Sequence, residues 1–258
     1  MSDPVAIFTF ADALADLARD IAREHFRSTT AFELKADASP VTVADRAIEL
    51  AMRVAIQERF PGHGILGEEM GRLVGDDQLW VLDPIDGTKA FVTGMPLFGT
   101  LIAYLDEEVP RLGVIEMPAL GERWSASLGV TAFAGNPCRT SGCLSIDEAR
   151  VYTSSPDVFT VEDWQRYERM SKRAAMRRFG GDCYMYGLLA SGHCDLVVEA
   201  SLMPYDYMAL VPVVEGAGGL MTDWDGRPLG LGSDGRVVAS ASAALHDRAL
   251  KMLAENSV

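Results

Sequence analysis

The sequence predicts an α+β protein, and two observations carry this expectation. Two amphipathic helical patterns come first and a series of short strand patterns follows them, an order that is typical of α+β folds. After about residue 147, strand and helix patterns alternate, which predicts a partly parallel sheet covered by helices. With 258 residues, the chain is long enough to bury a substantial core. We therefore expect one compact unit of two halves, residues 1–146 and 147–258.

The first half begins with two expected helices. Apolar residues recur at helical spacing over residues 4–26, whereas residues 27–41 have the composition of a loop. Thr42, followed three residues later by Asp45, has the form of a capping box, which predicts a second helix that begins there. Pro61 then ends this second helix.

Short apolar runs predict the strands of the first half. The first, over residues 65–67, leads into Glu68, and the second, over residues 79–82, leads into Asp83. Because Pro84 lacks an amide hydrogen and restricts the residue before it, we expect the second strand to stop at Asp83. Four antiparallel strands, the first two forming a hairpin, are expected over residues 97–105, 111–117, 124–127 and 131–134.

The second half has a different pattern. The expected elements are a strand at 151–153, a helix at 161–175, a strand at 176–179, a helix at 182–191, a strand at 195–199, a helix at 206–217, strands at 220–223 and 237–239, and a helix at 243–255. Pro212 lies inside the third of these helices, so we expect that helix to be kinked or to begin later.

The charge and the cysteines restrict the classes of partner and the compartment. A formal net charge of −14 argues against nucleic-acid and anionic-membrane binding, because both require a basic surface. No segment approaches the roughly 18 apolar residues that cross a bilayer, and the N-terminus lacks the pattern of a secretory signal. The four cysteines lack the spacing of a zinc site, so we expect reduced thiols in a cytoplasmic protein.

The most informative residues follow the expected strand that ends at Asp83. Asp83 and Asp86 stand three residues apart in a turn, with the Ile85 carbonyl between them. Gly87 permits a tight turn, and Thr88 places a hydroxyl at an expected helix start. Carboxylate, carbonyl and hydroxyl oxygens suit a hard divalent cation, and free backbone amides suit an anion. The ordinary alternative is a turn between two core elements.

Several other polar residues each have an ordinary interpretation when taken singly. Glu68 fits a solvated surface acid, Lys35 a solvated loop lysine, and Asp182 a turn residue that caps a helix. Asp45 fits the capping box, and Asp206 fits a helix cap. Their order along the chain, however, is informative when they are taken together with the acidic turn.

As a set, these residues resemble the inositol monophosphatase superfamily. The resemblance rests on Asp83-Pro84-Ile85-Asp86-Gly87-Thr88, preceded by Gly67-Glu68-Glu69 and followed by Asp206 and Gly216-Ala217-Gly218-Gly219, and it covers essentially the whole chain. It implies a layered αβαβα fold and a lithium-sensitive, magnesium-dependent phosphomonoesterase. It also implies a homodimer, for which the apolar hairpin at residues 97–117 is a candidate part of the interface.

The resemblance assigns metal ligands. Glu68, Asp83 and the Ile85 carbonyl would hold one Mg²⁺. Asp83, Asp86 and Asp206 would hold a second, and Glu68 a weaker third. Two like charges about 4 Å apart repel by about 4 kcal/mol at an effective dielectric constant of about 20, so the bare acids would repel a phosphate dianion. We therefore expect the site to be inactive without its two or three metal ions.

The same resemblance implies the residues of catalysis and substrate binding. Asp45 and Thr88 would orient or deprotonate the attacking water beside Glu68, and the amides of Gly87 and Thr88 would bind phosphate oxygens. The substrate-binding residues would be Gly87, Thr88, Asp182, Glu199 and Asp206, with secondary roles for Lys35 and Glu69.

Within the superfamily, the sequence is most similar to the histidinol-phosphate phosphatases of histidine biosynthesis. The similar segments are Thr88-Lys89, Phe98-Gly99-Thr100-Leu101, Phe179-Gly180-Gly181-Asp182-Cys183-Tyr184, Asp195-Leu196-Val197-Val198-Glu199 and Pro204-Tyr205-Asp206-Tyr207. L-Histidinol carries an ammonium and an imidazole, so its pocket needs acceptors, which we expect Asp182 and Glu199 to supply. Charge-assisted hydrogen bonds contribute about 1.5–3 kcal/mol each, enough to select among phosphate esters.

Other functions stay open. An inositol-1-phosphate phosphatase would use the same metals with a neutral polyol. A 3′-phosphoadenosine 5′-phosphate phosphatase would need basic or aromatic residues for its nucleotide, and a fructose-1,6-bisphosphatase would need an arginine-rich patch that is not evident in the sequence. The alternative from a different class is a non-catalytic regulatory module with the same fold, against which the complete set of carboxylates argues.

Overall fold

The computed structural model describes residues 3–28, 32–34 and 40–255, so the expected site residue Lys35 lies outside the described residues. The helices are α1 (Pro4–His25), α2 (Val43–Arg59), α3 (Thr88–Val92), α4 (Val161–Ser171), α5 (Cys183–Ala190), α6 (Pro204–Tyr207), α7 (Leu210–Gly216) and α8 (Ala243–Ala254), with single 3₁₀ turns at Ile146–Glu148 and Pro156–Val158. None of these helices is long and apolar enough to cross a membrane.

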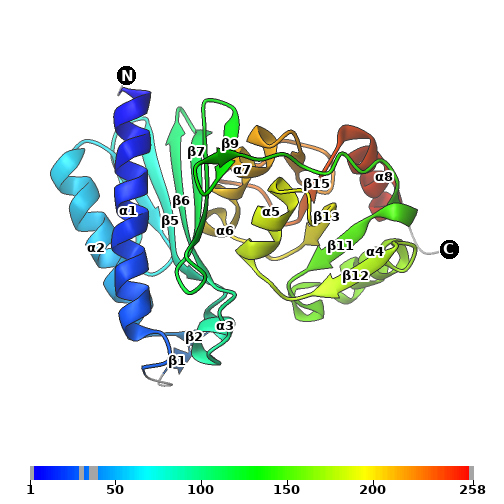
Figure 1. Ribbon diagram of the computed structural model, residues 1–258, viewed down its shortest axis with the longest axis horizontal. Coiled ribbons are helices and arrows are strands. Elements are labelled where there is room, and N and C mark those ends of the chain that lie inside the picture. The colour runs from blue at the N-terminus through cyan, green and yellow to red at the C-terminus, as the bar shows by residue number, and fades with distance from the viewer. Residues whose placement is uncertain (1–2, 29–31, 35–39, 256–258) are drawn as a thin grey trace.

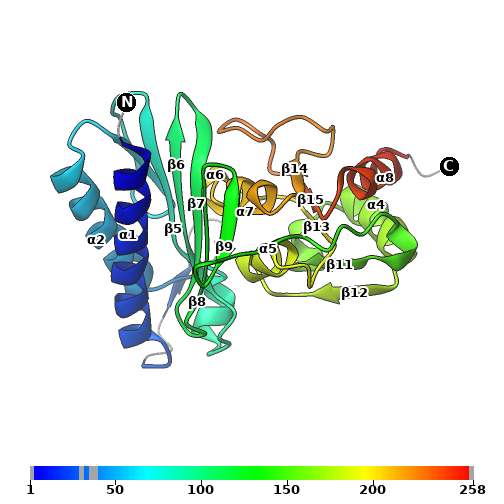
Figure 2. The same cartoon turned by 45° about the horizontal axis from the view of Figure 1, so that its top comes forward.

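The elements form five successive layers (Figure 1). The helices α1 and α2 form one outer layer and pack on an eight-stranded sheet. The helices α5, α6 and α7 lie between that sheet and a five-stranded sheet, and Figure 2 shows α4 and α8 beyond the second sheet. The expected layered αβαβα fold is therefore confirmed.

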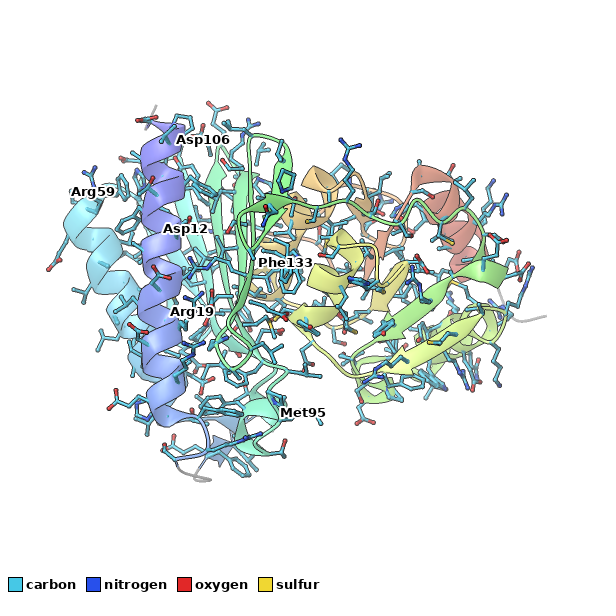
Figure 3. All side chains as sticks on the ribbon, viewed as in Figure 1. Asp12, Arg19, Arg59, Met95, Asp106 and Phe133 are labelled. Carbon is cyan, nitrogen blue, oxygen red and sulfur yellow. The ribbon has the colours of Figure 1, made fainter. Side chains whose placement is uncertain are left out.

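Local sequence explains the outer helices. The Asp3 side chain accepts a hydrogen bond from Val5 N at 3.0 Å, and Pro4 occupies the first turn of α1, where a missing N–H has no consequence. The expected capping box of Thr42 and Asp45 begins α2. Figure 3 shows Arg19 on α1, and its Nε lies 2.5 Å from Glu116 of the sheet below.

The first sheet contains the strands β3 (Gly64–Gly67), β4 (Gly71–Leu73), β5 (Gln78–Asp86), β6 (Gly99–Asp106), β7 (Val109–Met117), β8 (Glu122–Ser127), β9 (Val130–Phe133) and β10 (Asn136–Pro137). Their order is β10-β9-β8-β7-β6-β5-β3-β4, and the β3–β5 pair is parallel whereas the other pairs are antiparallel. A separate pair, β1 (Glu33–Leu34) and β2 (Pro40–Val41), lies within the stretch that was expected to be a loop.

The strand β5 continues beyond the residue where it was expected to stop. Asp83 pairs with Leu101 and Asp86 pairs with Gly99, so three steps along β5 match two steps along β6. This extra residue is a β-bulge, a place where a sheet accepts a proline. The Thr100 hydroxyl also donates a hydrogen bond to the Pro84 carbonyl at 2.8 Å. The prediction that Pro84 ends the strand is therefore wrong.

The expected role of the hairpin at residues 97–117 in a subunit interface stays a prediction, and the surface that the hairpin could offer is restricted to its exposed tip, residues 107–111. Its strands β6 and β7 lie in the middle of the sheet, with α1 on one face and α5 and α7 on the other. Residues 98–105 and 112–117 are buried within the chain. The apolar character of the hairpin thus reflects packing on both faces of the sheet.

The second sheet contains the strands β11 (Arg150–Thr153), β12 (Met176–Phe179), β13 (Leu196–Glu199), β14 (Leu220–Thr222) and β15 (Val237–Ser240). Their order is β12-β11-β13-β15-β14, with parallel pairing among the first three strands, which confirms the partly parallel sheet. The helix expected at 206–217 is two helices, because α7 begins only at Leu210, with Pro212 in its first turn. The later start allowed for that helix is therefore confirmed.

Candidate active site

Carboxylates from both halves of the chain converge at one edge of the first sheet. In the parallel β3–β5 pair, Gly67 lies opposite Leu82, so Glu68, which follows β3, and Asp83, which lies within β5, are neighbours at the same end of the two strands. The short helix α6, which carries Asp206, packs against β5. Carboxylate oxygens of Asp83, Asp86 and Asp206 all lie within 4.8 Å of one another.

Asp83 lies at the centre of this cluster and has the environment of a cation ligand. Its side chain is only 1% exposed, and its Oδ1 has no hydrogen-bond partner among the described residues. Burial raises the pKa of Asp83 well above its usual value, and repulsion from Glu68, Asp86 and Asp206 adds to the effect. A hard divalent cation would relieve both problems, so the residues present fit Mg²⁺.

Asp86 and Asp206 each have one oxygen that is fixed by a backbone amide. Cys183 N donates to Asp86 Oδ2 at 2.5 Å, and Met203 N donates to Asp206 Oδ2 at 2.6 Å. The cap that was expected for Asp206 is therefore present, in addition to its place in the cluster. Burial is the main cause that raises the pKa of both carboxyls to about 7, against the opposing effect of these bonds.

Asp45 has one oxygen in the helix cap and one without a partner. Its Oδ2 accepts bonds from Thr42 N at 2.8 Å and from the Thr42 hydroxyl at 2.5 Å. Its Oδ1 is buried and has no hydrogen-bond partner among the described residues. Burial raises the pKa of Asp45, with a smaller contribution from the charge of Glu68. The capping interpretation thus accounts for only half of this carboxylate.

The residues after Asp86 form the next wall of the site. Gly87 adopts a left-handed conformation with φ of +80°, which turns the chain from β5 into α3. The Thr88 hydroxyl donates to the Ile85 carbonyl at 3.0 Å, so these two expected site residues contact each other. The first amides of α3 have no acceptor within the helix and are oriented for an anion.

A pocket of about 510 Å³ begins at the acid cluster and extends between the two halves of the chain. Its walls include Asp86, Gly87, Thr88, Lys89, Ser154, Ser155, Asp157, Asp182, Tyr186, Glu199 and Asp206. A larger pocket of about 630 Å³ lies elsewhere, between the start of α1 and α7, and none of the expected site residues lines it. The smaller pocket is therefore the candidate substrate site.

Asp182 projects into this pocket from an unusual backbone conformation. Its φ is +45°, and the two glycines before it, Gly180 and Gly181, also have positive φ values. A Cβ atom at Gly87 would lie only 2.8 Å from Asp182 Oδ2, so this carboxyl packs directly against the acidic turn. The expected cap is absent, since the Asp182 side chain makes no capping bond to α5. Burial, followed by repulsion from Asp86 and Glu199, raises its pKa to about 8.

Glu199 is buried at the end of β13 and has a partner for each oxygen. Ser154 N donates to Oε1 at 3.2 Å, and the Tyr186 hydroxyl donates to Oε2 at 2.8 Å. Burial raises the pKa of Glu199, and these two bonds oppose the shift. Sequence reasoning did not find Ser154 or Tyr186, because their contacts depend on how β11 and α5 pack against β13.

A second missed group supports the turn that contains Glu68. Glu49 on α2 is fully buried, and its carboxylate accepts bonds from Glu69 N and from Arg53 Nε, each at 2.7 Å. The secondary residue Glu69 thus contributes its backbone amide here. Asp45, Glu49 and Arg53 are spaced by four on the buried face of α2. Charged residues on an otherwise apolar helix face indicate buried polar contacts, and this pattern is visible in the sequence.

The chain has close relatives over nearly its whole length. The model of the inositol monophosphatase family matches residues 3–257. The chain is 44% identical over 253 residues to the bifunctional phosphatase IMPL2, chloroplastic, of Arabidopsis thaliana, which covers 94% of this chain and 73% of that one. It is 36% identical over 250 residues to a histidinol-phosphatase of Mycobacterium tuberculosis, with 93% and 95% covered.

A solved structure agrees with these sequence relationships. An inositol monophosphatase from Zymomonas mobilis matches with a TM-score of 0.90 and 44% identity, covering 98% of this chain and 99% of that one. The shared fold, the converging carboxylates and the full-length sequence matches lead to one conclusion. The chain belongs to the inositol monophosphatase family of phosphoric monoester hydrolases.

Proposed function

We propose that this phosphoric monoester hydrolase converts L-histidinol phosphate to L-histidinol and phosphate, in a reaction that requires Mg²⁺. The observation that carries the proposal is the pair of carboxyls, the half-buried Asp182 and the buried Glu199, that lines the pocket beside the acid cluster. A neutral polyol could donate hydroxyl hydrogen bonds to these two acids, but it carries no positive charge to balance theirs. An alcohol that carries an ammonium and an imidazole would pair with them.

The similarity to named relatives is compatible with this substrate without deciding it. The Mycobacterium tuberculosis relative is a histidinol-phosphatase, whereas the Zymomonas mobilis structure is that of an inositol monophosphatase. Hydrolysis of inositol 1-phosphate is therefore our second candidate function. The chemistry of the pocket favours the cationic substrate, because each charge-assisted bond contributes about 1.5–3 kcal/mol.

The proposed metal ligands belong to two overlapping sets. Glu68, Asp83 and the Ile85 carbonyl form one set, and Asp83, Asp86 and Asp206 form the other, with Glu68 also open to a weaker third ion. Bound Mg²⁺ would neutralise these acids and lower the pKa of a coordinated water. The unpartnered Oδ1 of Asp83 and the short separations within the cluster support the assignment.

The protein's own groups then orient the reactants. Asp45, whose Oδ1 has no partner among the described residues, would accept the proton of the attacking water, and the Thr88 hydroxyl would orient that water. The amides of Gly87 and Thr88 at the start of α3 would hold phosphate oxygens. Asp182 and Glu199 would bind the ammonium and the imidazole of the alcohol. In this scheme residues 1–146 supply most metal ligands, and residues 147–258 supply Asp206 and the selectivity.

A side-by-side assay of phosphate release tests the proposal. L-Histidinol phosphate, inositol 1-phosphate and 3′-phosphoadenosine 5′-phosphate would be compared at equal Mg²⁺, with chelator and lithium as separate additions. We expect the highest kcat/KM for L-histidinol phosphate, with loss of activity in chelator and inhibition by lithium. Equal or faster turnover of inositol 1-phosphate would overturn the substrate assignment. Metal binding without turnover of any ester would instead favour a regulatory module.

Two further expectations concern the cellular location and the oligomeric state of the protein. The four cysteines are free thiols, which is compatible with a cytoplasmic location. A homodimer is expected from the family resemblance, and molecular mass in solution, measured by light scattering, tests it.

A further inference from the structure

A buried ion pair on α2, formed by Glu49 and Arg53, is hydrogen-bonded to the backbone of the turn that follows β3. The Glu49 carboxylate, which is 0% exposed, accepts a hydrogen bond from Glu69 N at 2.7 Å through Oε2 and from Met70 N at 3.0 Å through Oε1. Arg53 Nε donates to Glu49 Oε1 at 2.7 Å, and Arg53 Nη2 donates to the Gly71 carbonyl. The turn is therefore attached to α2 at three successive residues.

Gly67 makes this close attachment possible. A Cβ atom at Gly67 would lie 2.1 Å from Glu49 Oε1 and 2.8 Å from Oε2, a separation that no side chain could tolerate. The carboxylate therefore lies directly over the backbone of Gly67, at the end of β3. Glu68 lies between Gly67 and Glu69 in the chain. Glu49 packs against the first of these residues and accepts a hydrogen bond from the amide of the second, so both neighbours of Glu68 are held in place.

We propose that Glu49 is a positioning residue that sets Glu68 against Asp83, and thereby sets the affinity of the metal site; this inference rests on the metal-dependent activity proposed above. Glu49 is not among the residues that line the pocket or form the acid cluster in the described part of the chain, so we place its action in the turn that it holds. The separation between Glu68 and Asp83 determines whether the two acids can share one cation. Groups that orient metal ligands in this way typically change metal affinity by roughly 10- to 100-fold when they are removed.

An ion pair is physically well suited to hold this turn. A carboxylate accepts stronger bonds from backbone amides than a neutral group does, so it fixes the turn more tightly. An unpaired carboxylate at this depth would be strongly disfavoured, and it would add a further negative charge beside the acid cluster. Arg53 cancels that charge, with its Nε 2.7 Å from Glu49 Oε1. The pair therefore anchors the turn without adding to the repulsion.

Direct metal titration of Glu49→Gln tests the inference. The amide group of glutamine places a donor where Glu49 now accepts a backbone N–H, so the grip on the turn should weaken. Calorimetric titration with Mg²⁺ and Mn²⁺ in the absence of substrate should show affinity reduced by roughly 10- to 100-fold. Because no substrate is present, a wrong substrate assignment would leave this result unchanged. In a separate assay, kcat at saturating Mg²⁺ should recover most of its value.

The matched control is Glu116→Gln. Glu116 is also a fully buried glutamate, bonded by Arg19 at 2.5 Å and by Arg123 at 2.6 Å, and it does not line the candidate pocket. This variant should lose thermal stability and keep the metal affinity of the unmodified protein. An equal loss of metal affinity in both variants would mean that Glu49 acts through general stability, and the inference would be overturned.

A double-mutant cycle identifies the residue through which Glu49 acts. If Glu49 works through Glu68, then Glu49→Gln should have little further effect on metal affinity in a Glu68→Gln background. Additive losses would overturn the inference. Should Glu49→Gln not fold, Arg53→Lys gives the same test, because lysine keeps the charge and cannot bond both Glu49 and Gly71 in the same way. Unchanged metal affinity in a folded Arg53→Lys protein would equally count against the proposal.

Discussion

Buried and half-buried carboxylates occupy two contrasting environments in this protein. At the far end of β13 from Glu199, Asp195 accepts four hydrogen bonds, three of them from Arg150 and one from Ser141. Burial alone would raise the pKa of Asp195, but these bonds outweigh it and hold the pKa below its usual value. Asp83, Asp86 and Asp206 have no ion pair among the described residues and face one another instead. Their pKa values are all raised.

The difference separates structural acids from functional ones. An acid that is paired with arginine is satisfied within the chain and needs nothing further. Acids that are buried together without a cation are unstable as a group until a ligand of opposite charge arrives. Burial of an acid is therefore a poor guide to function by itself, and the presence or absence of a nearby cation decides between the two interpretations.

The largest effect that this contrast predicts comes from Asp86→Asn. The variant removes a proposed metal ligand, so phosphate release should fall to near background, while thermal stability without metal should hold or rise because one repelling charge is lost. Asp195→Asn is the matched control, with lowered stability and unchanged turnover per folded molecule. Phosphate-release assays and thermal unfolding check both variants. Retained turnover of Asp86→Asn at ordinary Mg²⁺ would mean that the ligand assignment is wrong.

A smaller and more selective effect is expected from Asp182→Asn. The loss of one charge from the pocket should raise KM for L-histidinol phosphate by roughly 10- to 100-fold, with little change in KM for a neutral phosphate ester. Steady-state kinetics on both substrates measure the difference. Parallel losses on the two substrates would assign Asp182 a structural role, which its positive φ and its contact with Gly87 would then explain.

The smallest effect concerns how the free energy of unfolding depends on pH and on bound metal. Burial above all raises the pKa of Asp86 and Asp206 to about 7 and that of Asp182 to about 8. Unfolded carboxyls titrate near pH 4, so from about pH 4 to about pH 8 the folded metal-free protein binds more protons than the unfolded chain, and its free energy of unfolding falls as pH rises. Asp195, with its lowered pKa, acts only at more acidic pH.

Thermal unfolding in chelator should therefore show a Tm that decreases from about pH 5 to about pH 8, and added Mg²⁺ should remove most of that decrease. A Tm that rises with pH in chelator would show that the acids are already compensated within the chain. The proposed difference between the paired Asp195 and the acids of the cluster would then be wrong.

The order of elements and the acids of the cluster were readable from the sequence because both are local patterns. Asp83, Asp86 and Asp206 each lie in an element whose type is set by nearby residues, and the structure brings them together as expected. The position of Glu49 on the apolar face of α2 was a readable signal, but the bonding partners of Glu49 and Tyr186 were not readable, since each depends on how separate elements pack together. The packing of the hairpin at 97–117 within the chain was not readable for a related reason. Apolar runs report burial and do not say what covers them.

The bulge in β5 has a consequence for how Asp83 and Asp86 come to face each other. In a regular strand, side chains alternate, so residues separated by three positions point to opposite faces. Asp83 and Asp86 nevertheless lie on one side, because the additional residue between them shifts the phase of the alternation by one step. The acid cluster thus depends on a break in periodicity: a perfectly regular β5 would direct one of the two aspartates to the opposite face of the sheet.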